Sequence, residues 1–230
     1  MKKPINETRA LNMELRRKRI IEAAREIITS DGFDTLTTRK LAAAAGVTTP
    51  TLYNLIGSMD DIFTTLVEQC GEKVRSHLDN LVSDLDGLTL FQETTNFSID
   101  VLCEDAATFK AIGLATERRA LVQDASAVDD SVLNATVPVF LRAIQRAKET
   151  GQLLGRIDEK LLAEYCYATY RAAYIDWCRG LSNDAIFRAR AHHGTLVCLL
   201  ADAKDEARNS LLESIGVLEM KLSVDSQLHA

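Results

Sequence analysis

The sequence contains little of what builds membrane spans, secretion signals or interrupted folds. Only three prolines occur in 230 residues. No apolar run approaches the ~20 residues that a membrane-spanning helix needs. Residues 1–19 carry repeated charges and lack the apolar segment of a signal peptide. We therefore expect a soluble, cytoplasmic protein with no membrane partner.

Cysteine and histidine are too dispersed for a metal site. The five cysteines form no CxxC pair, which argues against both a zinc site and a disulfide framework. His192 and His193 are adjacent, so they point to different faces of a helix and make a poor metal pair. We expect reduced, mostly buried thiols, with neither metal nor cofactor. The cysteines are Cys70, Cys103, Cys166, Cys178 and Cys198.

Apolar residues make up 47% of the chain and recur at helical spacing throughout. No segment shows the alternation of a strand, so the sequence predicts an all-α fold. Pro138 lies inside one helical pattern, where it should kink the helix or split it. The expected helices are 11–30, two short ones within 36–56, 59–85, 88–103, 105–122, 129–150, 158–179, 183–202 and 204–222.

Charge divides the chain into two unlike parts. Residues 1–57 hold ten Lys+Arg against six Asp+Glu, a net charge of +4. Because the whole chain has a net charge of −6, residues 58–230 have a net charge of −10. A basic end on an acidic body is typical of a nucleic-acid reader with a second domain, although a solvated basic tail gives the same count. We expect a DNA-binding domain at 1–57, a connecting helix at 58–86, a larger domain at 87–222 and a frayed tail at 223–230.

The stretch TTRKLAAAAGVTTPTLYN, residues 37–54, has the spacing of two helices that cross at a tight turn. Thr37 or Thr38 can cap the first helix. Ala42 falls where the helices approach most closely, and Gly46 can adopt the left-handed conformation that ends the first helix. These positions predict a helix-turn-helix.

The second short helix presents a polar face. Thr48 or Thr49 can cap it, and Pro50 suits its first turn, where a missing N–H costs nothing. This face is able to enter a major groove with its N-terminus first. Its members are Thr49, Pro50, Thr51, Tyr53 and Asn54.

This string resembles the DNA-binding region of the TetR family. The segments TTRKLA, AGV and PTLY carry the likeness, supported by RIIEAA at 19–24, Gly32-Phe33 and Asp60-Asp61-Ile62, so that it covers residues 16–66. The resemblance implies an N-terminal three-helix DNA-binding domain and a larger C-terminal helical domain for ligand binding and dimerisation. It further implies a non-enzymatic homodimeric regulator, usually a repressor, that a small-molecule effector releases from a palindromic operator.

The resemblance also assigns DNA contacts. Thr38 and Arg39 match positions that contact phosphate and, for the arginine, a base edge. The first turn of the second short helix, together with Thr48 and Asn54, matches base and phosphate contacts. Tyr53 matches a tyrosine that binds phosphate, while the alternative is that it packs against the first helix.

Two departures remove groups that often grip phosphate in this family. Met59 replaces a lysine, and Leu55 and Ile56 replace aromatic and histidine positions. Backbone N–H groups of Ser58 and Met59 could bind phosphate instead. The basic residues 16–19 could compensate, or could form a solvated segment.

A line of rings in helix 158–179 indicates a ligand pocket or an ordinary core. The rings recur at spacings of three and four, which aligns them on one face, and the preceding helices supply possible opposite walls. As no charge cluster marks the ligand, we expect an apolar or aromatic effector. The rings are Tyr167, Tyr170, Tyr174 and Trp177, and the opposite walls are Phe91, Phe97, Cys103 and Phe109.

Small residues in helices 158–179 and 183–202 allow close packing between two subunits, or equally within one. They are Ala168, Ala172, Ala173, Ala185, Ala189 and Gly194. The long fourth helix would couple effector to DNA.

Two other classes of protein could have these features. One is an all-helical enzyme or lipid-binding protein with the same pocket, and the other is a scaffold that binds only protein. The sequence has no nucleophile elbow, phosphate loop or HExxH motif, so we expect no enzyme.

Overall fold

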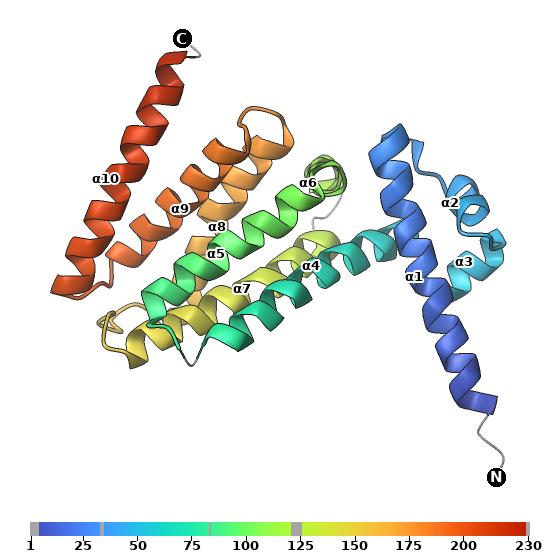
Figure 1. Ribbon diagram of the computed structural model, residues 1–230, viewed down its shortest axis with the longest axis horizontal. Coiled ribbons are helices and arrows are strands. Elements are labelled where there is room, and N and C mark those ends of the chain that lie inside the picture. The colour runs from blue at the N-terminus through green and yellow to red at the C-terminus, as the bar shows by residue number, and fades with distance from the viewer. Residues whose placement is uncertain (1–4, 33–34, 83, 121–125, 229–230) are drawn as a thin grey trace.

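The computed structural model describes residues 5–32, 35–82, 84–120 and 126–228, with side chains omitted at 5–8, 118–120, 126–135 and 225–228. These residues form helices and no named strand, which confirms the all-α prediction. Figure 1 shows α1, α2 and α3 grouped at one end, with α4 leading from them into the larger bundle. The helices are α1 (Ile5–Asp31), α2 (Thr38–Ala44), α3 (Thr49–Leu55), α4 (Met59–Leu81), α5 (Gly87–Glu104), α6 (Ala106–Ala120), α7 (Ser126–Glu149), α8 (Glu159–Cys178), α9 (Asp184–Leu200) and α10 (Asp205–Leu228).

The smaller unit is built on the C-terminal half of α1. Its apolar stripe packs on α2, α3 and α4, and Ile20 and Ala24 are fully buried. Residues 11–19 are all exposed, so this part of the helix projects beyond the core. α1 begins at Ile5, six residues before the expected start, because a helix needs no buried face where its backbone bonds are made internally.

The helix α4 begins at a capping box and runs between the two units. The Ser58 hydroxyl accepts from the Asp61 N–H at 3.3 Å, and the Asp61 carboxylate accepts from the Ser58 N–H at 2.6 Å. These hydrogen bonds from Ser58 lower the pKa of Asp61. The helix ends at Leu81, four residues before the expected end, and a short turn leads into α5.

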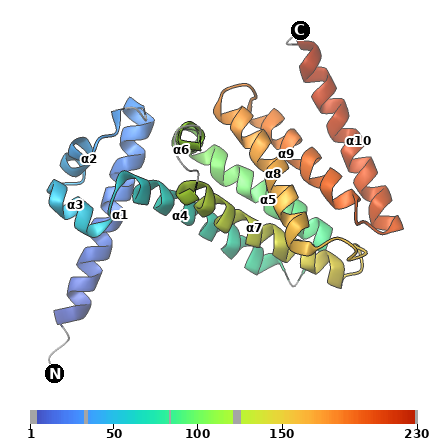
Figure 2. The same ribbon diagram turned by 180° about the vertical axis from the view of Figure 1, so that it is seen from behind.

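The larger unit is a bundle in which α4, α5, α7, α8 and α9 pack around one core. A line of ring contacts crosses that core at centroid separations of 5.0–5.9 Å, which is favourable spacing for aromatic pairs. The contacts join Phe91, Phe140, Tyr170, Phe187 and Trp177 in that order. Figure 2 shows α10 on the outside of this bundle, where it packs on α9.

Two local expectations differ from the structure. Of the two outcomes expected for Pro138, the split does not occur, since α7 runs from Ser126 to Glu149 with the proline ring exposed to solvent; a kink stays a prediction. The predicted tail at 223–230 is wrong for residues 223–228, because α10 continues to Leu228.

Gly87, the first residue of α5, lies against the backbone of α7. A Cβ atom at this position would lie 1.9 Å from the Ala147 nitrogen and 2.0 Å from its Cα. Backbone atoms cannot yield to such a contact as a flexible side chain can. The glycine therefore sets how closely α5 approaches α7.

We expect Gly87→Ala to lower the free energy of unfolding by about 3 kcal/mol, because α5 and α7 must separate. The matched control is Gly216→Ala in α10, where a Cβ would meet nothing within 4 Å. This control should gain up to about 1 kcal/mol from helix propensity. Urea unfolding monitored by circular dichroism measures both, and equal midpoints for the two variants would contradict the close approach.

Candidate functional site

Residues 37–55 form the two-helix unit that their spacing predicts. The Thr37 hydroxyl caps α2 by accepting from the Lys40 N–H at 3.2 Å. Gly46 takes a φ of 66°, the left-handed conformation expected at the turn. Leu41 and Leu52 are fully buried and close the small core between the helices.

The helix α3 has an open polar edge. Thr48 caps it, accepting from the Thr51 N–H at 3.3 Å, and the two threonine hydroxyls lie 2.8 Å apart. Pro50 and Asn54 are exposed. Tyr53 retains 50% exposure, so it is not enclosed beneath α1. This edge is exposed, so a large partner such as duplex DNA can contact it.

The opening of α2 adds to the same unit. Arg39 is exposed, and Thr38 is partly exposed. No charged partner of Arg39 appears among the described contacts, whereas the neighbouring Lys40 pairs with Asp31 at 2.6 Å. Arg39 therefore projects a free fork of donors, suited to a carboxylate, a phosphate or a guanine edge.

Two expectations for phosphate contacts change in the structure. The Ser58 N–H is already donated to Asp61 in the capping box, so it is not open to a phosphate. Arg17 in the basic segment donates from Nε to the Leu55 carbonyl at 2.7 Å. It therefore holds the C-terminal end of α3 against α1, a structural role that the sequence did not reveal. Its neighbours Arg16, Lys18 and Arg19 are exposed.

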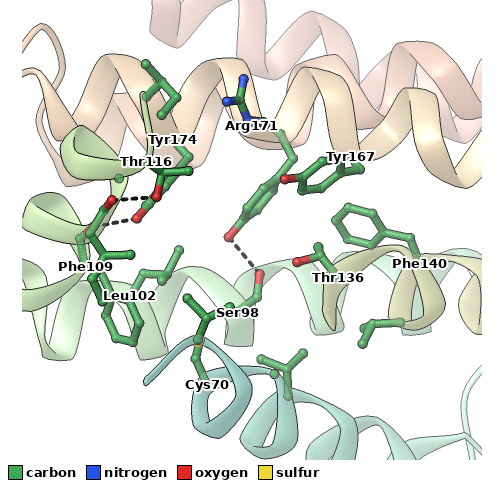
Figure 3. A pocket seen from close by; sticks show the side chains of 18 of the residues that line it. Cys70, Ser98, Leu102, Phe109, Thr116, Thr136, Phe140, Tyr167, Arg171 and Tyr174 are labelled. Carbon is green, nitrogen blue, oxygen red and sulfur yellow. Dashed lines mark hydrogen bonds between the residues drawn. The ribbon is translucent and has the colours of Figure 1, made fainter. Parts of the chain in front are cut away.

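The larger unit contains a partly open cavity of about 90 Å³ between α4, α5, α6, α7 and α8 (Figure 3). Apolar and hydroxyl-bearing side chains make up most of its wall. The described lining residues are Val67, Cys70, Gly71, Val74, Thr94, Ser98, Leu102, Phe109, Ile112, Gly113, Thr116, Thr136, Val139, Phe140, Tyr167, Tyr170, Arg171, Tyr174 and Ile175.

Four of the eight residues predicted from the sequence lie in this wall: Phe109, Tyr167, Tyr170 and Tyr174. Ligand binding by them stays a prediction. Three of them lie on one face of α8, as the spacing indicated, and this face lines the cavity.

The other four lie outside the described lining. Phe91 stacks on Phe140 in the core, and Phe97 stacks on His77 with ring centroids 3.8 Å apart. Trp177 is fully buried against Phe187 and donates from Nε1 to Asp184 at 2.7 Å. Cys103 is half-buried and packs at the edge of the core. Their partners come from other helices, so the period of each helix alone could not separate them from cavity residues.

Sequence reasoning missed most of the wall. Val67, Cys70 and Val74 come from α4, and Thr94 and Ser98 come from α5. The α4 residues belong to an apolar stripe that was visible in the sequence but was read as helix packing. Nothing local distinguishes threonine and serine inside an amphipathic helix as cavity residues.

Burial favours the neutral form of two tyrosines and one cysteine in the cavity wall. Desolvation raises the pKa of the Tyr170 and Tyr174 hydroxyls and raises that of Cys70 to about 11. The Tyr174 hydroxyl donates to the Phe109 carbonyl at 2.5 Å, and the Thr116 hydroxyl donates to the Ile112 carbonyl at 2.7 Å. These two hydroxyls therefore already donate hydrogen bonds within the protein.

One polar side chain in the wall lacks a partner. The Thr94 hydroxyl is buried without any hydrogen bond, although a buried polar atom normally has one. The adjacent Thr95 differs, since it donates to the Phe91 carbonyl at 2.8 Å.

The two units are tied together beside the cavity. Arg25 of α1 forms an ion pair with Asp105, between α5 and α6, and donates to Gln69 of α4 at 3.2 Å. Helix α4 therefore lines the cavity and also packs in the smaller unit. The ion pair between Arg25 and Asp105 is a second link between the smaller unit and the helices beside the cavity.

These features define an all-helical protein with an N-terminal helix-turn-helix and a separate internal cavity. Residues 20–66 match the family model described as bacterial regulatory proteins, tetR family. This match places the N-terminal helix-turn-helix among those of TetR-family DNA-binding transcriptional regulators, as the sequence indicated. None of the helices described is long and apolar enough to cross a membrane.

Solved structures of other proteins share the fold. FadR of Thermus thermophilus, a repressor in complex with lauroyl-CoA, has 16% identity and a TM-score of 0.68 over 82% of this chain and 96% of its own. RolR in complex with resorcinol has 20% identity and a TM-score of 0.62, covering 88% and 95%. SmeT, the repressor of the Stenotrophomonas maltophilia efflux pump SmeDEF, has 20% identity and a TM-score of 0.63, covering 83% and 92%. The search of curated proteins found no match.

We expect Thr94→Val to raise the free energy of unfolding by about 1 kcal/mol, because it replaces an unpaired buried hydroxyl by an isosteric methyl group. The control is Thr95→Val, which removes a hydroxyl that is already hydrogen-bonded and should bring no gain. Chemical unfolding of both variants decides the matter. A loss of stability in Thr94→Val would mean that its hydroxyl has a partner in solution.

Proposed function

We propose that this protein is a cytoplasmic homodimeric repressor that binds a palindromic operator through α3 and leaves it when a small molecule fills the cavity. The observation that carries the proposal is the open edge of α3, from Thr49 to Asn54, on a rigid two-helix unit. A scaffold or an enzyme would have no use for such an edge.

The exposed groups supply both kinds of DNA contact. Arg39 reads a base edge or binds phosphate, and the Tyr53 hydroxyl donates to a backbone phosphate. Thr49, Pro50 and Thr51 approach the bases at the start of α3. Thr38, Thr48 and Asn54 border this surface and contact phosphate or bases beside it.

Solved relatives support the effector site. FadR and RolR are described with lauroyl-CoA and resorcinol bound, and FadR and SmeT are described as repressors. The cavity here is apolar with scattered hydroxyls, which suits an apolar or aromatic molecule.

The helix α4 couples the two sites. Its residues Val67, Cys70 and Val74 form one wall of the cavity, while Ile62 and Phe63 are buried at its N-terminal end. An effector that favours one tilt of α4 changes the separation of the two α3 helices in the dimer. Operator affinity then falls by the free energy that the effector gains from that state.

The dimer forms through α8 and α9. Leu161, Tyr165, Ala168 and Ala172 follow each other at spacings of four, three and four, and all are exposed. They form one apolar stripe along α8 that none of the described residues covers. Four such helices, two from each subunit, bury this stripe as a bundle.

The remaining small residues pack within one subunit or lie apart from the stripe. Ala173 and Ala189 are buried, and a Cβ on Gly194 would lie 2.7 Å from the Thr169 Cβ, so Gly194 allows α9 to approach α8. Ala185 is exposed at the start of α9.

Tyr53→Phe should weaken binding to operator DNA about fivefold to tenfold, because one hydrogen bond to phosphate is lost. Ser223→Ala, which removes an exposed hydroxyl on α10, is the control and should bind normally. Mobility shift with the DNA that flanks the gene measures both. Affinity should also fall steeply as salt rises, and a chain that showed no preference for this DNA over random duplex would disprove the regulator proposal.

The double variant Ala168→Glu, Ala172→Glu should be monomeric, because two carboxylates then face their copies across a closely packed interface. Sedimentation velocity should show the monomer, with operator affinity reduced at least a hundredfold as each half-site is bound alone. The control is Leu181→Glu, an equally exposed residue beyond the end of α8. An intact dimer in the double variant would place the interface elsewhere.

A further inference from the structure

The hydroxyl groups at one side of the cavity have a fixed direction of hydrogen bonding. The Ser98 hydroxyl lies 2.8 Å from the Thr95 carbonyl oxygen and 3.1 Å from the Tyr170 hydroxyl (Figure 3). A serine hydroxyl has one proton to donate, and a carbonyl oxygen can only accept. Ser98 therefore donates to Thr95, and Tyr170 must donate to Ser98.

No residue that the structure describes donates a hydrogen bond to the Tyr170 oxygen. Its proton is committed to Ser98, while its lone pairs receive no hydrogen bond from the described residues. A hydroxyl that donates its proton can still accept a hydrogen bond, and a relay of this kind makes the terminal oxygen a better acceptor. The burial that raises the pKa of Tyr170 also keeps the group a neutral phenol.

Two further hydroxyls belong to the same wall. Thr94 lies one helical turn before Ser98 on α5, and its buried hydroxyl has no partner. Thr136 of α7 directs its hydroxyl toward the same space in Figure 3. At the other end of the cavity, Tyr174 and Thr116 already donate to backbone carbonyls. Unfilled hydrogen-bonding capacity is thus concentrated beside Ser98 and Tyr170.

The wall offers no counter-ion to a charged ligand. Arg171 alone carries a formal charge among the described lining residues, and Figure 3 shows its guanidinium directed away from the cavity. An ion in this space would lose its hydration without a partner. A volume of about 90 Å³ is below the ~150 Å³ of an engineered cavity that takes benzene, so the ligand is compact and shifts its surroundings slightly.

We propose that the effector is a compact neutral molecule, an aromatic ring that bears a hydroxyl group, and that its hydroxyl donates to the Tyr170 oxygen beside Thr94. The inference rests on the proposed effector site and gives it a chemical class. A ring that can only accept hydrogen bonds leaves the Tyr170 oxygen unpaired and binds less tightly.

Calorimetric titration of the full-length protein without DNA tests this with four probes of similar size: phenol, anisole, toluene and benzoate. Phenol should bind about tenfold more tightly than anisole or toluene, the value of one buried hydrogen bond, and benzoate should bind most weakly. If phenol fails to bind at millimolar concentration, or if anisole or benzoate equals it, the inference is wrong.

Three variants test the direction of the hydrogen bonds. Tyr170→Phe should reduce the phenol-to-anisole preference to about one, and Thr116→Val, whose hydroxyl is already paired, should keep the tenfold preference. Ser98→Ala removes the acceptor of the Tyr170 hydroxyl. The Tyr170 hydroxyl can then donate to the ligand oxygen, so the affinity for anisole should rise relative to that for phenol. A merely structural change would weaken both probes alike. An unaltered preference in Tyr170→Phe would overturn the assignment.

The outcome is separable from the proposed function. Binding of phenol through Tyr170 without release of operator DNA would leave the ligand class intact and contradict the release mechanism. Operator binding with no phenol preference would do the reverse.

Discussion

Both units of this protein depend on the burial of one helix, α4. Its N-terminal residues Ile62, Phe63 and Leu66 are almost completely buried, and Val74 and Leu78 are buried farther along the helix. Each fully buried side chain of this kind contributes about 1.5–3 kcal/mol of transfer free energy. The helix cannot move at one end without disturbing packing at the other, because both ends lie in closely packed surroundings. A ligand that contacts the cavity wall on α4 therefore pushes on a rigid helix that also packs in the smaller unit.

The helix-turn-helix could be predicted from the sequence because its determinants are local. Thr37, Ala42, Gly46 and Pro50 act within a few residues of themselves, through capping, close approach and backbone conformation. The structure places each of them as the spacing indicates. The free edge of α3 follows from the same pattern, since Leu41 and Leu52 fix which side of the unit is closed.

The cavity could be predicted only in part, because its wall comes from five helices. Helical period aligned Tyr167, Tyr170 and Tyr174 correctly, yet it also aligned Trp177, which Phe187 and Asp184 draw into the core. Phe97 satisfied the same pattern and faces His77 instead. Which ring faces open space depends on how distant helices cross, and a single chain of residues carries that information only weakly.

The hydrogen bond from Arg17 to the Leu55 carbonyl gives the basic segment a second meaning. Loss of the arginine would release the last turn of α3 from α1, so weaker operator binding in such a variant would reflect a misplaced helix as much as a missing charge. Transplanting α3 alone into a relative, to exchange operator specificity, would leave this tether behind. An exchange of DNA specificity would therefore need α1, α2 and α3 to be transferred together.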